Sequence, residues 1–235
     1  MIHSNGAPSP TCASFLKRAV EAPLPQAVDS AVTLLIDIGA FTSAEEDERI
    51  TRLGRHLADL PLHPRVGKML LYASLLGVLD PILTIACAGA YRPPFIIGTD
   101  SGRQNANRAK KGFSDSLGGG SDHLAIVQAF KEWEVACRNG RQAENHFLWN
   151  NSLSGSTLHM IKGMRLQLIT ALNQRGFIQN LQSASYNTNA TSLVRAVLAV
   201  GMYPLVGRML PQCRAPTLGT LKGERVRIHP GSVNA

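Results

Sequence analysis

Residues 60–90 read LPLHPRVGKMLLYASLLGVLDPILTIACAGA, and this stretch decides the fold class. Apolar residues are dense in it, yet no apolar run reaches the roughly 18 residues of a membrane helix. We predict a helix over residues 66–79 that ends before Pro81. Asp80 suits the N-cap and Pro81 the first position of a second helix over residues 82–90. The stretch therefore predicts two consecutive buried helices.

More helices are predicted after this pair. Residues 91–120 are rich in glycine and proline and predict a loop. Ser121 suits the N-cap of a helix over residues 122–138. A long helix is expected over about 152–174, because apolar residues recur there every three or four positions. The predicted core face of that long helix consists of Leu153, Thr157, Ile161, Met164, Leu168 and Leu172.

The first quarter of the chain predicts a small helical unit. From Ala27, apolar residues follow a helical spacing that ends at Gly39. Residues 45–49 are charged and predict a turn, and residues 50–57 begin with a strand-like pattern. A helix followed by a small hairpin is the pattern of a winged helix.

The last quarter of the chain changes character. Residues 179–192 are polar and rich in Asn and Ser, which predicts a linker. Residues 193–206 have a helical pattern. The alternation of apolar and charged residues at 226–229 predicts a strand.

The composition is that of a globular protein, and its charge is unevenly distributed. Hydrophobic residues make up 44% and charged residues 17%, which argues against a disordered chain. Residues 1–144 contain 15 Lys/Arg and 15 Asp/Glu, whereas residues 145–235 contain nine Lys/Arg and one acid, Glu224. A one-sided basic segment is typical of proteins that bind phosphate-bearing partners. A basic solvated surface without a ligand is the equally open alternative.

The cysteines indicate a reducing compartment. Cys12, Cys87, Cys137 and Cys213 lie far apart and form no C-x-x-C pair. We therefore expect reduced thiols in an intracellular protein, whether nuclear, cytoplasmic or in an organelle, rather than a disulfide scaffold or a zinc knuckle. Residues 1–11 lack the layout of a secretory signal and are expected to be a disordered start. No membrane partner is expected.

Catalytic and metal-binding motifs are missing from the sequence. The nearest approach to a P-loop is Gly67-Lys68-Met69, where methionine replaces the hydroxyl group that would reach magnesium. No cysteine or carboxylate completes a metal-binding set with His56 and His63. We expect no catalytic residue, metal or cofactor in this chain, and no ATP hydrolysis by it alone.

Asp122 and His123 are adjacent titratable residues at an expected helix start. Adjacent residues on a helix point about 100° apart, so they do not form a catalytic pair. We expect Asp122 to favour the first helical turn and His123 to make a local or interdomain hydrogen bond.

Candidate nucleic-acid-binding residues lie on and just before the long helix. Lys162 and Arg165 are three positions apart, so we expect them to share a helix side away from the apolar stripe. Small polar side chains nearby suit contacts with phosphate, sugar or base edges. The candidate nucleic-acid-binding set is Asn151, Ser154, Thr157, Lys162 and Arg165. An ordinary polar helix face is the alternative.

Several phrases, in this order, resemble the helicase-associated region of DEAH/RHA-type (DExH-box) ATP-dependent RNA helicases. Besides the opening stretch they are NRAKK (107–111), SDHLA (121–125), WNNSLS (149–154) and TLHMI (157–161). VRAVL (194–198), GMYP (201–204) and VRIHPGSVN (226–234) resemble the entry to that family's oligonucleotide/oligosaccharide-binding (OB) barrel. The SDH and HPGSVN phrases are most similar to the RHA-like branch.

The resemblance implies a mostly α-helical fold. The expected parts are a winged helix at 12–62, a helical ratchet-like bundle at 63–180, a linker at 181–192 and an incomplete, truncated OB-fold β segment at 193–235. In that family two RecA-like motor domains hold ATP and magnesium, and the accessory domains guide single-stranded RNA.

The motor motifs are missing here, so the resemblance implies an accessory RNA-binding region. Its expected partners are single-stranded RNA and a helicase motor or accessory protein. A second hypothesis is a protein-interaction module that docks a motor or another protein and does not bind RNA alone.

Overall fold

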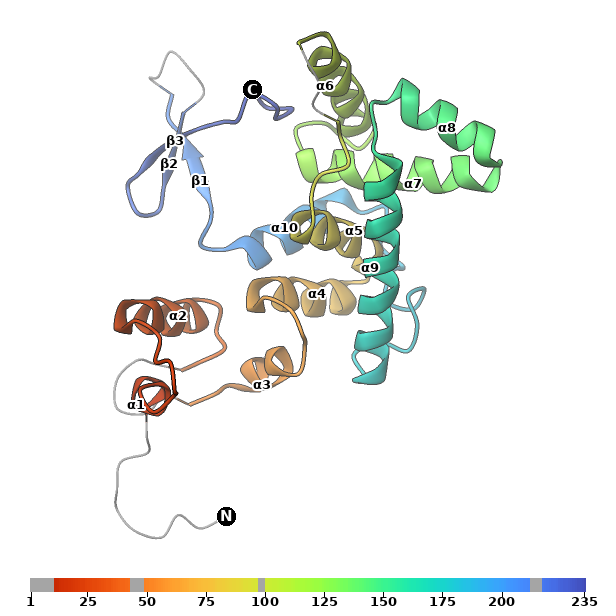
Figure 1. The fold of residues 1–235 in the computed structure, drawn as a ribbon. Coiled ribbons are helices and arrows are strands. Elements are labelled where there is room, and N and C mark those ends of the chain that lie inside the picture. The colour runs from red at the N-terminus through yellow and green to blue at the C-terminus, as the bar shows by residue number, and fades with distance from the viewer. Residues whose placement is uncertain (1–10, 43–48, 97–99, 212–216) are drawn as a thin grey trace, which may run out of the picture. The chain divides into compact units, whose positions relative to one another are not determined.

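The computed structural model describes residues 11–42, 49–96, 100–211 and 217–235. The chain divides into two compact units, residues 1–68 and 69–235. Helices dominate, and one small sheet follows them in the chain (Figure 1). The predicted mostly helical fold class is therefore confirmed. Within the described ranges, no helix combines the length and apolar character needed to cross a membrane.

The described residues of the first unit form three helices and the beginning of a fourth. These are α1 (Cys12–Leu16), α2 (Pro25–Asp37), α3 (Arg52–Ala58) and α4 (Pro64–Leu76). Phe41 and Ile50 form an isolated antiparallel bridge. The predicted disordered start and most of the predicted turn at 45–49 lie outside the described residues.

The strand-like pattern predicted for the start of residues 50–57 is found only at Ile50, which pairs with Phe41, and α3 begins two residues later. The Thr51 hydroxyl accepts a hydrogen bond from the Gly54 amide over 3.0 Å and caps this helix. Gly54 also permits a close backbone approach, since a Cβ atom there would lie 2.2 Å from the Ala40 carbonyl oxygen. Short cap-driven helices of this kind carry little hydrophobic periodicity.

The second unit is built from six further helices. They are α5 (Leu79–Ala90), α6 (Asp100–Asp115), α7 (Asp122–Arg138), α8 (Arg141–Asn150), α9 (Gly155–Gln174) and α10 (Thr191–Met202). Helix α7 packs against α5, α6 and α8, and α5 also packs against α9 and α10 (Figure 1). The helix predicted after Ser121 is confirmed, and the Ser121 hydroxyl accepts from the Leu124 amide.

An aromatic core holds these helices together. Trp133 is completely buried, and its ring centroid lies 5.4 Å from that of Phe130. Leu158 and Ile161 of α9 are also fully buried in the same cluster. The predicted core face of the long helix is buried or half-buried along its length, which confirms that stripe.

The break between the two helices of the opening stretch differs from the prediction. Helix α4 ends before Gly77, whose φ of +70° suits glycine. Helix α5 then begins at Leu79 with Val78 at its N-cap. Asp80 therefore lies in the first turn and not at the N-cap, and its carboxylate has another role.

The prediction that residues 91–120 form a loop is also wrong, because α6 occupies half of that range. Its apolar face is narrow: Ala106 and Phe113 are buried and Ala109 is half-buried. Polar and glycine residues fill the other positions, so tertiary packing rather than intrinsic propensity stabilises this helix.

The polar segment over residues 179–190 is attached to the helices. The Leu79 amide donates to the Ala184 carbonyl oxygen over 3.1 Å, and the Asp80 amide donates to the Ser185 hydroxyl over 3.1 Å. The Asn187 side chain donates to the carbonyl oxygen of Leu76. These bonds satisfy backbone groups at the junction of α4 and α5.

A three-stranded antiparallel sheet follows α10. Its strands, in the order β1-β2-β3, are β1 (Gly207–Met209), β2 (Thr217–Thr220) and β3 (Arg225–Arg227). In the register of the sheet, Leu218 lies opposite both Met209 and Val226. The predicted strand is therefore present at Val226 and Arg227, whereas the OB-barrel assignment stays a prediction.

Candidate nucleic-acid interface

Trp149 is the most exposed aromatic side chain among the described residues, with 86% of its surface open to solvent. It lies in the last turn of α8 and lines two adjacent hollows of about 450 and 480 Å³. The second hollow is more apolar and includes Ile96, Leu148 and Leu153. The first, which we call the Trp149 hollow, is lined by Asn105, Arg108, Ala109, Trp149, Asn150, Asn151 and Ser152.

Several polar groups of the Trp149 hollow have no partner within the described residues. The guanidinium group of Arg108, the carboxamide of Asn105 and the indole N–H of Trp149 make no hydrogen bond or ion pair there. Arg108 and Asn105 both belong to α6 and are exposed. These groups are therefore free to bind a ligand with acceptor atoms.

The loop between α8 and α9 forms one wall of this hollow and is held firmly. The Asn151 side-chain amide donates to the Phe147 carbonyl oxygen over 2.9 Å, which satisfies a helix-end carbonyl. Ser152 adopts a positive φ of 51°, an uncommon conformation for serine. Its carbonyl oxygen accepts from the Ile96 amide over 2.8 Å. The sharp turn at Ser152 keeps Asn151 beside Trp149.

A half-buried carboxylate fixes α8 against its neighbours. Glu144 accepts hydrogen bonds from the Trp133 indole N–H over 3.0 Å and from His159 over 3.0 Å. Burial acts to raise the pKa of Glu144, but these two hydrogen bonds and the nearby imidazole outweigh it, so its pKa is lowered. The ionised carboxylate thus ties α8 to α7 and α9, and it positions the helix that carries Trp149.

Two of the predicted RNA-binding residues maintain the start of α9. The Ser154 hydroxyl is the N-cap acceptor for the Thr157 amide, at 3.3 Å. Thr157 is only 1% exposed, and its hydroxyl accepts from Arg92 Nε over 3.1 Å. Both side chains are therefore engaged inside the protein, next to the Trp149 hollow.

The prediction that Lys162 and Arg165 share an exposed helix side is wrong. Lys162 is exposed, with its ammonium group 3.3 Å from the Glu134 carboxylate and 5.7 Å from the Trp133 ring. Arg165 is only 7% exposed. A signal for this burial was present in the sequence, because Arg165 lies four positions after Ile161 and so falls on the apolar stripe.

The Arg165 guanidinium group is satisfied by α5. Its Nη1 donates to the Asp80 carbonyl oxygen over 2.6 Å and to the Thr84 hydroxyl, and its Nη2 pairs with the Asp80 carboxylate. The guanidinium carbon also lies 4.9 Å from the Phe130 ring centroid. Arg165 therefore links α9 to α5 through hydrogen bonds and an ion pair.

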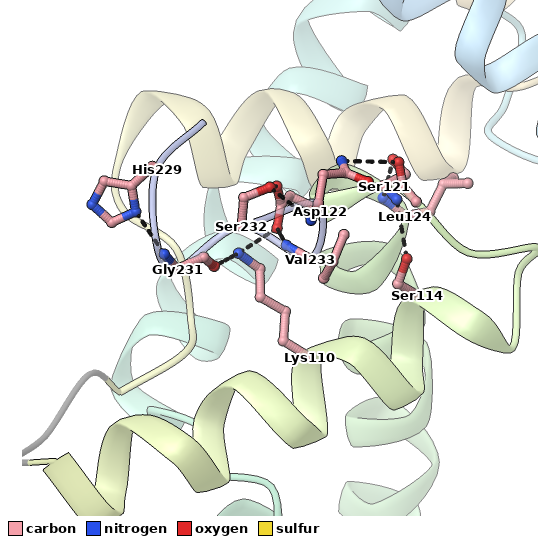
Figure 2. Close-up of polar contacts among 11 residues, drawn as sticks. Lys110, Ser114, Ser121, Asp122, Leu124, His229, Gly231, Ser232 and Val233 are labelled. Atoms are coloured by element: carbon pink, nitrogen blue, oxygen red, sulfur yellow. Dashed lines mark hydrogen bonds and ion pairs between the residues drawn. The ribbon is translucent and has the colours of Figure 1, made fainter. Parts of the chain in front are cut away.

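A polar cluster ties the C-terminal segment, residues 229–235, to the start of α7. Figure 2 shows Asp122 between Lys110 of α6 and Ser232. Lys110 lies 2.5 Å from the Asp122 carboxylate and donates to the Gly231 carbonyl oxygen over 2.8 Å. The Ser232 hydroxyl and the Val233 amide donate to the same carboxylate over 2.6 and 3.1 Å (Figure 2).

The pKa values of Asp122 and His123 are both lowered in this cluster. Burial acts to raise the pKa of Asp122, but the hydrogen bonds from Lys110, Ser232 and Val233 outweigh it and lower the pKa. Burial is the main cause that lowers the pKa of His123, which makes no hydrogen bond to the described residues. The hydrogen bond predicted for His123 is therefore not found there, and Asp122 binds a distant segment besides opening a helix.

The described ranges contain no group of three or more His, Cys, Asp or Glu side chains placed to hold a metal ion.

Two family models match consecutive segments of the chain. The helicase-associated (HA2) winged-helix domain matches residues 31–62, and the ratchet-like HA2 domain matches residues 63–126. The second match includes the helices α5 and α6 and the start of α7. These two domains are those that the sequence phrases resemble.

Similar proteins are DExH-box helicases. The chain is 40% identical over 232 residues to the DExH-box ATP-dependent RNA helicase DExH6 of Arabidopsis thaliana. The aligned segment covers 96% of this chain and 18% of that protein. It is 39% identical over 225 residues to DExH1 of Arabidopsis thaliana (94% of this chain, 22% of the relative). It is 33% identical over 230 residues to the ATP-dependent DNA/RNA helicase DHX36 of Homo sapiens (94% and 22%).

The chain thus spans about a fifth of the length of these relatives, and nearly all of it aligns with them. The matched domains follow one another in the expected order, winged helix first and ratchet-like domain second. The chain thus contains the winged-helix and ratchet-like helicase-associated domains, and nearly its whole length is similar to a segment of DExH-box RNA helicases.

Proposed function

We propose that this region binds single-stranded RNA through the Trp149 hollow, as an accessory part of an ATP-dependent RNA helicase. The observation that carries the proposal is the exposed indole of Trp149 beside the unpaired guanidinium group of Arg108. An exposed aromatic ring next to a cation is the arrangement on which unpaired bases stack and phosphates are held. The names of the similar proteins, which are RNA helicases, support the same substrate class.

The chemistry of the hollow suits one nucleotide of a single strand. A base stacked on an aromatic side chain contributes about 1–3 kcal/mol. Arg108 can bind either a phosphate or a base edge, because its planar fork matches both. Asn105 and Asn151 add acceptors and donors at the rim of the hollow.

The five predicted RNA-binding residues take different parts in this proposal. Asn151 contacts the nucleotide directly, since it lines the hollow. Ser154 and Thr157 position the loop that carries it. The exposed ammonium group of Lys162 attracts the strand electrostatically. Direct contact by Arg165 is not part of the proposal, because its guanidinium group is buried and bonded to α5.

Hydrolysis of ATP is assigned to the motor domains of the family and not to this region. Neither ATP nor magnesium is a proposed ligand of this chain. Its proposed role is to hold the strand while a motor moves it, and a motor or accessory protein is the proposed protein partner. The three-stranded sheet is proposed to be the first part of an OB barrel.

A fluorescence-anisotropy titration with a labelled eight-nucleotide uridine strand tests the proposal. The chain should bind the strand unaided, and Trp149→Ala should weaken binding about 5- to 100-fold through the lost stacking energy. Arg108→Ala should flatten the log–log salt dependence by about 0.7, the value for one phosphate contact. Trp149 and Arg108 are exposed, so both variants should keep the fold.

Matched controls use exposed residues outside the hollow. Phe15→Ala removes another exposed aromatic ring, and Arg103→Ala removes another exposed cation of α6. Lys17→Ala with Arg18→Ala lies in the charge-balanced part of the chain and should leave the salt dependence unchanged. Unaided binding that no hollow variant weakens would contradict the site, and no binding at all would favour a protein-interaction module.

A further inference from the structure

We infer that the Trp149 hollow selects guanine over the other bases, an inference that rests on the proposed RNA-binding function. The inference follows from which hydrogen-bonding groups of the hollow are already used and which remain free. Arg108 offers donors, Asn151 offers an acceptor, and Trp149 offers the stacking surface. Only a base that has acceptor atoms facing Arg108 and a donor facing Asn151 can use both residues while it stacks on Trp149.

The donor side of the hollow is a planar fork. Arg108 carries five N–H groups, none of which bonds another described residue. Such a fork binds two neighbouring acceptor atoms at once, and the O6 and N7 atoms of guanine are its commonest partner among the bases. Lysine lacks this fork and binds as a point charge.

The acceptor side is fixed by a bond inside the protein. The Asn151 side-chain amide lies 2.9 Å from the Phe147 carbonyl oxygen. A carbonyl oxygen can only accept, so the Asn151 nitrogen must be the atom that faces it, and the amide orientation is decided. The Asn151 side-chain oxygen accepts no hydrogen bond from the described residues, so it remains available to a ligand in the hollow, of which Asn151 is a lining residue.

The four bases match these two sides differently. Guanine presents the acceptor pair O6 and N7 on one edge and the N1–H and N2–H donors on the next. Adenine places its N6 amino donor beside N7, which opposes the Arg108 fork. Uracil flanks its single N–H with two carbonyl groups, so it offers no adjacent acceptor pair. Cytosine has an acceptor pair, but its single ring offers less area for stacking on Trp149.

The volume of the hollow is compatible with a purine. At about 450 Å³ it lies within the usual range of small-molecule sites. The wall at the α8–α9 loop is held by backbone hydrogen bonds, so the acceptor does not need to be ordered on binding. A preformed acceptor and a free donor fork favour discrimination by base edge.

The inference is tested with five eight-nucleotide uridine strands that differ at one central position. That position holds guanine, adenine, cytosine, uracil or 7-deazaguanine, and a single guanine prevents association between guanine-rich strands. The guanine strand should bind the full chain roughly tenfold more tightly than the adenine, cytosine and uracil strands. The 7-deazaguanine strand lacks the N7 acceptor and should lose most of that advantage.

Arg108→Lys keeps the positive charge and removes the fork, and Arg103→Lys on the same helix is its matched control. The guanine preference should disappear in Arg108→Lys and persist in Arg103→Lys. If all five strands bind equally and Trp149→Ala still weakens them, the guanine inference is overturned while the RNA-binding proposal stands. If the preference persists when 7-deazaguanine replaces guanine, and persists also in Arg108→Lys, then Arg108 is not the residue that recognises guanine. Failure of every strand to bind overturns both.

Discussion

Replacing Asp80 with alanine should destabilise the second unit by about 3 kcal/mol, because it leaves a buried guanidinium group without its counterion. Arg165 is 7% exposed, and the Asp80 carboxylate is its one ionic partner among the described residues. Breaking a buried pair costs about 3–5 kcal/mol. The low end applies here, since Arg165 keeps its bonds to the Asp80 carbonyl oxygen and to Thr84.

Removing the other partner should cost less. Arg165→Met removes the buried charge and keeps an unbranched side chain against Phe130. The Asp80 side chain is 39% exposed, so water can solvate the carboxylate that is left. We expect a cost of about 1 kcal/mol for Arg165→Met. The double variant should cost little more than Arg165→Met, which corresponds to a coupling energy of about 3 kcal/mol.

Urea unfolding followed by tryptophan fluorescence measures these differences. The chain has two tryptophans, so a Trp149→Phe background leaves Trp133, in the core of the second unit, as the reporter. Asp80→Ala should lower the thermal midpoint by about 6–12 °C, at roughly 2–4 °C per kcal/mol. Equal small costs for both single variants, or additive costs in the double variant, would refute the buried pair.

Four further outcomes are expected. Asp122 has a lowered pKa in the folded protein, so its contribution to stability is present above roughly pH 4 and should be lost as the pH falls below that value. Hydrogen exchange of residues 229–235 should accelerate there, and also in Asp122→Asn at pH 7. Burial raises the pKa of Cys87 to about 11, so this thiol should resist alkylation at pH 8 until the protein is unfolded, as mass spectrometry would show. Gly54→Ala should lower the free energy of unfolding of the first unit by more than about 2 kcal/mol, because the new Cβ atom would lie 2.2 Å from a backbone oxygen. Calorimetry of the variant measures this loss. The purified chain should show no ATP hydrolysis above a buffer control in a phosphate-release assay, with or without RNA, and activity that survives repurification would contradict this expectation.

Periodicity and capping residues predicted the long, apolar helices well. Ser121 caps α7 as its sequence suggests, and the stripe through Ile161 and Leu172 is buried. In both cases the signal is local, since it depends on residues within a few turns. Helix α6 was missed because its buried face is reduced to a few positions such as Phe113, and partners from α7 stabilise it. That stabilisation is tertiary, so no local pattern records it.

The candidate site could be predicted only in part, because its residues come from separate helices. Asn151 was identified from its neighbours on the chain. Arg108 lies some 40 positions away on a helix that the sequence did not predict, so its place beside Trp149 required the fold. The contact between Asp122 and Ser232 spans 110 residues and could not follow from spacing along one element.

The most direct test of the RNA-binding site observes Trp149 itself. Labelling with 5-fluorotryptophan gives one fluorine resonance for each of the two tryptophans, and the Trp149→Phe variant assigns them. During titration with the single-guanine strand, the Trp149 resonance should shift progressively while that of the buried Trp133 stays in place. An unchanged Trp149 resonance at saturating RNA would contradict the proposed site.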